Sequence, residues 1–138
     1  MKTYRSFITV AFMSLAIAGF GQKFEKGNVV SLFTVEYTLE EGMTFVQFEK
    51  FFLEEYIPAL EKNFPVTEFH LLKGERGERT GKYTEMIIFD SLEERNRWWP
   101  ESGKSTEATK KAFDNMRELQ DRMQKMIANA TFTDYLVL

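Results

Sequence analysis

His70 is the only histidine of the chain, and it lies among side chains suited to acid–base chemistry. Glu68 lies two residues earlier, so both side chains point to the same face of an extended strand. Glu36, on another predicted strand, is expected to share that face. Histidine titrates near neutral pH and a carboxylate orients its ring, so His70 with Glu68 and Glu36 would suit proton abstraction from a phenolic or enolic ligand. The alternative is a strand histidine that is hydrogen-bonded at a rim or an interface.

Two further carboxylates, Glu85 and Asp134, interrupt otherwise apolar strand patterns. Burial of a carboxylate is unfavourable unless the group is paired. These acids therefore indicate either a polar cluster that lines a cavity or exposed groups that form salt bridges. The cations considered for such salt bridges are Lys73, Lys82 and Arg79.

A set of aromatic residues is the second feature that could form a functional site. Trp98 and Trp99 are adjacent, and consecutive helical positions point about 100° apart, so we do not expect both to face the same core. Either one tryptophan caps a pocket or lies in a dimer contact, or one is buried and the other half-exposed. We predict that five aromatic side chains bind a ligand: Trp98, Trp99, Tyr37, Phe52 and Tyr56.

Residue usage excludes several kinds of site. One histidine and no cysteine do not supply a usual zinc site, so we expect no metal. Residues 74–81 lack the glycine spacing of a phosphate-binding loop, and we expect no cofactor. Met116, Met123 and Met126 fit a helical core stripe better than a copper site. A haem-binding variant, with His70 as the axial ligand, stays open as a third alternative.

Residues 1–21 have the organisation of a cleavable signal peptide. Lys2 and Arg5 precede a short apolar run, and small residues follow it. The run is shorter than the roughly 20 apolar residues that span a bilayer. We expect cleavage after Gly21, with Ala18 as the alternative, and export to the periplasm or beyond the cell.

Residues 22–138 then form a single domain without disulfides or a lipid anchor, because the chain has no cysteine. The net charge of −3 becomes more negative when the basic residues of the signal peptide are removed. Such a domain lacks the clustered cations that bind nucleic acid or anionic lipid. We therefore expect no nucleic-acid partner and no membrane anchor.

The first half of this domain has the patterns of a strand, a helix and a hairpin. Residues 29–39 have an apolar odd-numbered face and many β-branched and aromatic residues, which favours a strand. Thr44 and Gln47 have capping-box spacing and begin an amphipathic helix, in which Pro58 predicts a kink or a break. The two strands of an antiparallel hairpin are predicted at 66–73 and 82–89.

The second half has the patterns of two helices and a strand. Ser91 caps a short helix that ends before Pro100. An apolar stripe predicts one long helix from about residue 105 through Ala130. Residues 131–138 predict the last strand.

This order of elements predicts a ferredoxin-like βαββαβ fold of the α+β class, with an antiparallel sheet and helices on one face. The other face carries Val30, Leu32 and Leu72, and it is too apolar to be fully exposed. An exposed apolar sheet face indicates a partner. We therefore expect a homodimer formed through this sheet face.

At this level the chain resembles the dimeric α/β-barrel superfamily, which includes antibiotic-biosynthesis-monooxygenase-like, EthD-like and NIPSNAP-like families. The resemblance rests on the element order, on the helix at 48–60 and on the short helix after the third strand. It implies that two sheets pack face to face and that each subunit encloses a pocket between sheet and helices. Members include cofactor-independent monooxygenases, isomerases, cyclases and haem-degrading enzymes, and the fold alone does not choose among them. No catalytic motif of these families transfers onto residues of this chain.

Two functional hypotheses from different classes follow. In the first, the chain is a dimeric barrel that binds a small apolar or aromatic ligand between sheet and helices. In the second, it is a cofactor-independent monooxygenase or isomerase. His70 would then be the general base, Glu68 or Glu36 would orient it, and Trp98 or Trp99 would line the pocket.

Overall fold

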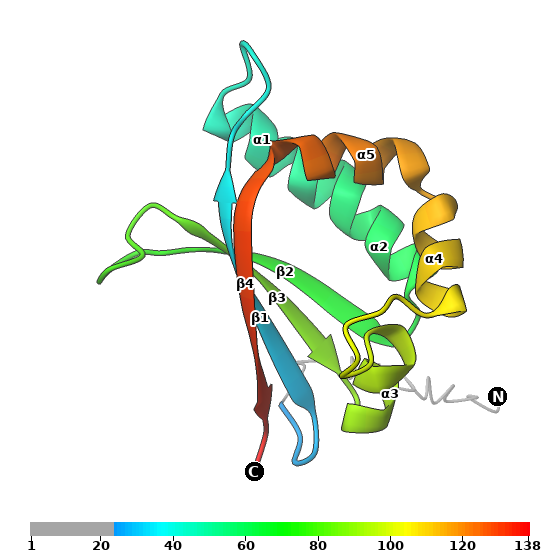
Figure 1. The fold of residues 1–138 in the computed structure, drawn as a ribbon. Coiled ribbons are helices and arrows are strands. Elements are labelled where there is room, and N and C mark those ends of the chain that lie inside the picture. The colour runs from blue at the N-terminus through cyan, green and yellow to red at the C-terminus, as the bar shows by residue number, and fades with distance from the viewer. Residues whose placement is uncertain (1–23) are drawn as a thin grey trace, which may run out of the picture.

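The computed structural model describes residues 24–138, and the predicted signal peptide lies outside them. The described part forms a four-stranded antiparallel sheet with the helices on one face (Figure 1). The strand order is β2-β3-β1-β4, so the first and third strands are central. This order, with the alternation of strands and helices, confirms the predicted ferredoxin-like fold.

The elements follow one another in the predicted sequence, with some shifted bounds. The strands are β1 (Val29–Tyr37), β2 (Thr67–Lys73), β3 (Tyr83–Phe89) and β4 (Ile127–Leu136). The helices are α1 (Phe45–Phe51), the π-helical segment η1 (Phe52–Tyr56), α2 (Ile57–Asn63), α3 (Leu92–Trp98), α4 (Glu107–Asp114) and α5 (Arg117–Met126). Within residues 24–138, none of these helices combines the length and the apolar character that crossing a bilayer requires.

The register of the sheet decides which side chains meet the helices. Val29 of β1 lies opposite Phe89 of β3, and both are buried. Side chains alternate along a strand, so the odd-numbered residues of β1 and β3 share the face toward the helices. Between this face and the helices lies the core, which includes the fully buried Phe48, Phe52 and Met123. The predicted core role of the methionine stripe is thus confirmed.

The first helical run continues past Pro58 without a break, one of the two predicted outcomes, and an irregular π-helical turn lies just before the proline. The Thr44–Gln47 capping box is present at its start. The amide of Ile57 reaches back five residues to the carbonyl of Phe52, so one wider turn precedes the proline. Pro58 then occupies the first turn of α2, where its missing amide proton costs little.

The predicted long second helix is wrong, because the chain forms two helices there. The break lies at Asn115 and Met116, and Met116 has non-helical dihedral angles while its side chain is buried. The side-chain Nδ2 of Asn115 donates to Asn63 Oδ1 at 3.1 Å, which ties the break to the end of α2. The last strand also begins earlier than predicted, at Ile127, because pairing with β1 extends to Tyr37.

Val66 is strained, and the strain is local. It has a φ of 62°, in the left-handed region that β-branched residues rarely adopt, and it follows Pro65 at the entry to β2. Its side chain is 62% exposed, so packing of this side chain does not offset the backbone strain.

We therefore expect Val66→Gly to raise the free energy of unfolding by about 1 kcal/mol, since glycine adopts this φ without steric cost. Val66→Ala is the matched control, because it shortens the side chain and keeps a Cβ at the same φ. Urea unfolding of both variants measures the difference. Equal or lower stability of Val66→Gly relative to Val66→Ala would contradict the strain.

Candidate functional site

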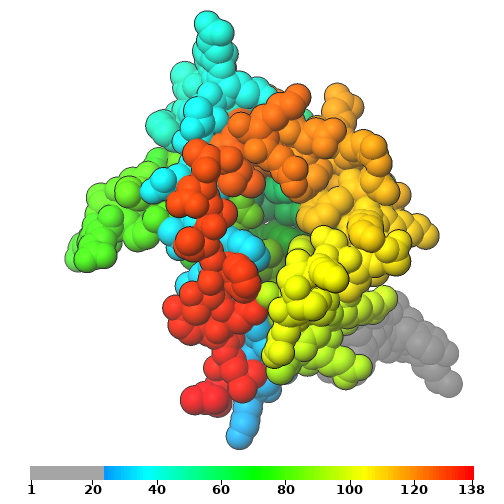
Figure 2. Space-filling view, in the orientation of Figure 1, coloured from blue at the N-terminus to red at the C-terminus, as the bar shows by residue number. Residues whose placement is uncertain are grey.

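The helix layer leaves much of β4 uncovered. Phe132 and Leu136 lie in register with Phe33 and Val29 on the helix side of the sheet, and yet both are 57% exposed. Figure 2 shows a hollow at this place, between β4 on one side and α4 on the other, with α5 above it, blue atoms of β1 beside β4 and green atoms of the α2–β2 region at its back. Phe33 stacks on Phe132 with ring centroids 5.5 Å apart, so aromatic surface lines the β4 side.

Glu85 lies on central strand β3, on the face toward the helices. Its neighbours across the sheet are Phe33 on β1 and Leu71 on β2, so apolar side chains flank its carboxyl group. The hydroxyl of Tyr37 donates a hydrogen bond to Glu85 Oε1. Within residues 24–138, no cationic side chain forms an ion pair with this carboxyl group. A tyrosine hydroxyl, rather than a positive charge, is therefore its partner.

A second hydroxyl extends this polar group. Tyr56 of η1 donates to Oε1 of Gln120 on α5 at 2.6 Å. Tyr56 is buried, and it lies close enough to Glu85 for a negative charge there to raise its pKa. Four elements thus bring together the residues that we call the Glu85 cluster: Glu85, Tyr37, Tyr56 and Gln120.

Burial raises the pKa of Glu85 above its ordinary value, and the hydrogen bond from Tyr37 opposes this shift only in part. Burial also raises the pKa of Tyr37 and of Tyr56, and the nearby Glu85 charge adds to both shifts. Both phenols therefore keep their protons, and Glu85 is the group of the cluster that titrates. A carboxyl group with a raised pKa can act as a general acid or as a hydrogen-bond donor to a ligand.

A separate ion pair ties α3 to β4. Arg95 is only 7% exposed, and its Nε donates to Asp134 Oδ2 at 3.0 Å. The Ser31 hydroxyl donates to the other oxygen of Asp134, and the Arg95 guanidinium group lies 5.7 Å from the ring centroid of Phe132. The partner of Asp134 is thus a helix residue, and not one of the strand and loop cations considered from the sequence.

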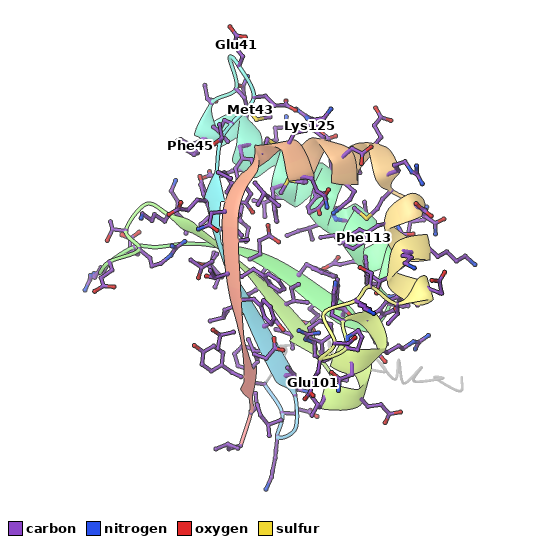
Figure 3. The ribbon with its side chains drawn as sticks, viewed as in Figure 1. Glu41, Met43, Phe45, Glu101, Phe113 and Lys125 are labelled. Atoms are coloured by element: carbon purple, nitrogen blue, oxygen red, sulfur yellow. The ribbon has the colours of Figure 1, made fainter. Side chains whose placement is uncertain are left out.

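The two tryptophans contact one buried ring, which corrects the expectation that both do not face the same core. Trp98 is buried and Trp99 is only partly buried, which matches the alternative of one buried and one half-exposed tryptophan. The ring centroids of Trp98 and Trp99 lie 4.9 and 5.2 Å from that of Phe64. Trp99 is the C-cap of α3 and has a φ of −133° and a ψ of 88°, so the angular spacing of helical residues does not apply to it. Phe113 joins this aromatic cluster from the inner side of α4 (Figure 3).

His70 and Glu68 lie on the opposite face of the sheet. His70 is opposite Met86 in register, and its Nε2 is 3.6 Å from Glu68 Oε2, which is beyond a normal hydrogen bond. Glu36 shares this face, as predicted, but it lies beyond the last β1–β3 pair and two strands from His70. The structure therefore does not gather the three residues, and none of them faces the Glu85 cluster. Their catalytic role stays a prediction.

The predicted ligand-binding residues lie on the helix side of the sheet or among the helices, with different surroundings. Tyr37 and Tyr56 belong to the Glu85 cluster, and Phe52 is fully buried beside Tyr56 with ring centroids 5.3 Å apart. Sequence reasoning missed Gln120, which lies among other polar helix residues and gives no signal. Glu85 was only one of several candidate strand acids. Its alternation with Tyr83 and Ile87 on one apolar face is the signal that marks it as enclosed.

Comparison with known proteins adds to the description of the fold. No family model matches the chain, and no curated protein matches it. It is similar to the structure of a Dabb-family protein with a ferredoxin-like fold from Mesorhizobium loti. That similarity has 15% identity, covers 82% of this chain and 99% of the other, and has a TM-score of 0.49. It is also similar to a structure from Bacteroides thetaiotaomicron that carries the name of an antibiotic biosynthesis monooxygenase. Here the identity is 16%, with 81% and 90% of the two chains covered and a TM-score of 0.43. These similarities concern the fold and assign no activity.

The pH dependence of stability tests the enclosure of Glu85. Because its pKa is raised in the folded state, the folded protein keeps a proton at pH values where an ordinary carboxyl, with a pKa of 4.5, has lost it. The stability that the protonated Glu85 contributes is fully present below pH 4.5, and it is lost as the pH rises through the pKa of Glu85 in the folded protein. We expect Glu85→Gln to abolish this loss, so that its free energy of unfolding falls less with rising pH.

Urea unfolding at a series of pH values measures this difference. Glu36→Gln is the matched control, because it makes the same chemical change at an exposed position of the sheet. Parallel pH profiles for the wild type and Glu85→Gln would contradict the enclosure.

Proposed function

We propose that this chain is an exported, homodimeric protein that binds a small apolar or aromatic ligand in the hollow between sheet and helices. The observation that carries the proposal is Glu85, a carboxyl group enclosed by apolar side chains and bonded by a hydroxyl. A sheet that needed only a core would place an apolar residue there, because an enclosed acid lowers stability. Ligand sites combine apolar walls with a few convergent polar groups, and the Glu85 cluster beside the Phe33–Phe132 stack has this character.

The outer face of the sheet supports self-association. Met86 and Leu32 are only partly buried there, and Leu72 and Tyr135 are 40% and 53% exposed. Glu68 Oε2 is buried and has no hydrogen-bond partner within residues 24–138. A second copy of this sheet would cover the apolar side chains, since a face of this kind is self-complementary under two-fold symmetry.

The alternative proposal is a cofactor-independent monooxygenase or isomerase with His70 as general base. The observation that favours it is the Glu68 carboxylate 3.6 Å from His70 Nε2, a separation that a small shift converts into an orienting hydrogen bond. Its substrate would have to reach the outer face of the sheet, because His70 does not face the hollow. This requirement separates the alternative from the ligand-binding proposal.

The first prediction of the ligand-binding proposal concerns the wall of the hollow. We expect Phe132→Ala to weaken the binding of a naphthalene derivative by about fivefold, since an aromatic contact contributes about 1 kcal/mol. Tyr135→Ala is the matched control, because Tyr135 lies on the same strand with a similar exposure of 53%, on the opposite face. Isothermal titration calorimetry measures both affinities. An equal loss in both variants, or no loss in Phe132→Ala, would place the ligand elsewhere.

The second prediction concerns the outer face. We expect Met86→Lys to weaken the homodimer by at least about a hundredfold, because an unpaired ammonium group is costly to bury in an apolar interface. Val46→Lys is the control, since Val46 is 75% exposed on α1 and lies on the helix layer. Native mass spectrometry and analytical ultracentrifugation at micromolar concentration measure the dimer. A wild type that is monomeric there, or a Met86→Lys variant that stays dimeric, would refute association through this face.

A further inference from the structure

The hydrogen bonds of the Glu85 cluster leave specific donors free. A tyrosine hydroxyl has one proton, and Tyr37 and Tyr56 donate theirs to Glu85 Oε1 and Gln120 Oε1. The groups that can still donate to a ligand are then the second oxygen of Glu85, when it is protonated, and the amide nitrogen of Gln120. Glu85 Oε2 has no hydrogen-bond partner within residues 24–138. It is also not one of the fully buried atoms, so part of its surface is exposed. This oxygen is therefore accessible.

The surroundings of Glu85 decide its charge. Its neighbours across the sheet are Phe33 and Leu71, and neither stabilises a negative charge. Because Oε1 accepts the hydrogen bond from Tyr37, a protonated carboxyl group carries its proton on Oε2. The free position is then a hydroxyl donor. Burial raises the pKa of Glu85, which favours this protonated form.

The charged and titratable groups on the packed elements do not alter this assignment. Tyr37 and Tyr56 are neutral phenols, and within residues 24–138 no cation forms an ion pair with Glu85 or contributes to the shift of its pKa. Three cations on the helix side of the sheet or on the helices above it are paired with other acids. These ion pairs are Lys73 with Glu49, Arg95 with Asp134, and Arg122 with Glu40. Each of these cations is therefore neutralised away from Glu85.

We propose that the hollow selects an uncharged aromatic ligand that carries an acceptor oxygen, such as a ketone, and that the Oε2 hydroxyl of a protonated Glu85 donates to that oxygen. This inference rests on the proposed ligand-binding function and adds the chemistry of the ligand. Gln120 supplies a second donor from its amide nitrogen. A ligand that offers only a donor or a positive charge leaves these two donors without an acceptor, which costs hydrogen bonds in an enclosed site.

Three probes with one ring system test the selection: 2-acetylnaphthalene, 2-ethylnaphthalene and 2-(aminomethyl)naphthalene. They present an acceptor oxygen, no polar group and a cation. Calorimetric titration of the purified protein over a pH series gives the affinity for each. We expect the ketone to bind at least about tenfold more tightly than the hydrocarbon below the pKa of Glu85, and this advantage to disappear as pH rises through it.

Glu85→Gln separates a neutral donor from a negative charge. The glutamine amide accepts from Tyr37 through its oxygen and donates through its nitrogen, so it copies the protonated acid. We expect this variant to keep the affinity for the ketone within about threefold and to lose its pH dependence. Glu36→Gln, on the other face of the sheet, should leave the wild-type profile unchanged.

Tighter binding of the amine, with an affinity that rises with pH, would overturn the inference while leaving ligand binding in the hollow intact. Equal affinities for the ketone and the hydrocarbon at every pH would do the same. If none of the three probes binds the wild type, both the inference and the proposed function fail. The pH series on the wild type alone gives these outcomes even if Glu85→Gln does not fold.

Discussion

A carboxyl group enclosed at the middle of a central strand is the constraint on which the rest of this structure depends. Glu85 cannot be covered by a tightly packed helix without a partner, because burial of an unpaired acid is strongly unfavourable. The structure supplies Tyr37 from the neighbouring strand, and Tyr56 and Gln120 from the helix layer. The apolar core is complete on either side of this cluster, from Phe89 at one end of the sheet to Phe48 on α1. The polar cluster and the hollow thus interrupt an otherwise continuous core.

The position of β4 determines that the hollow stays open. This edge strand pairs with β1 along its whole length, yet its helix-side residues Phe132 and Leu136 are more than half exposed. The ion pair of buried Arg95 with the more exposed Asp134 joins α3 to the strand near its end. Breaking such a pair leaves an uncompensated charge, so the strand is held at a fixed distance from the helices. One side of the hollow is therefore set by a specific contact rather than by general packing.

The sequence predicted the order of elements well and the details of the second half less well. Caps at Thr44 and Ser91 and the alternation in the hairpin strands are local signals, and the structure confirms them. The break at Asn115 and the early start of β4 depend on contacts with distant residues, Asn63 and Tyr37, which no local pattern contains.

The candidate site could be predicted only in part, for a similar reason. Tyr37 and Tyr56 were predicted as ligand-binding residues, and they do meet at the Glu85 cluster. His70 has the residue type of a general base, but alternation of side chains places it on the face away from the helices. Choosing Glu85 among the strand acids required knowing which face of each strand the helices cover, and this is a property of the folded chain.

The pKa of the Glu85 carboxyl group itself is the most direct test of an enclosed neutral acid in this fold. The ¹³C chemical shift of its Cδ, followed by NMR through a pH titration of protein labelled at glutamate, reports that value, and Glu85→Gln assigns the resonance. We expect a midpoint well above the ordinary 4.5, and a further rise when 2-acetylnaphthalene is bound, because the ligand accepts a hydrogen bond from the protonated form. A midpoint at or below 4.5 would mean that the carboxyl group is ionised and solvated, which contradicts an enclosed neutral acid at this position.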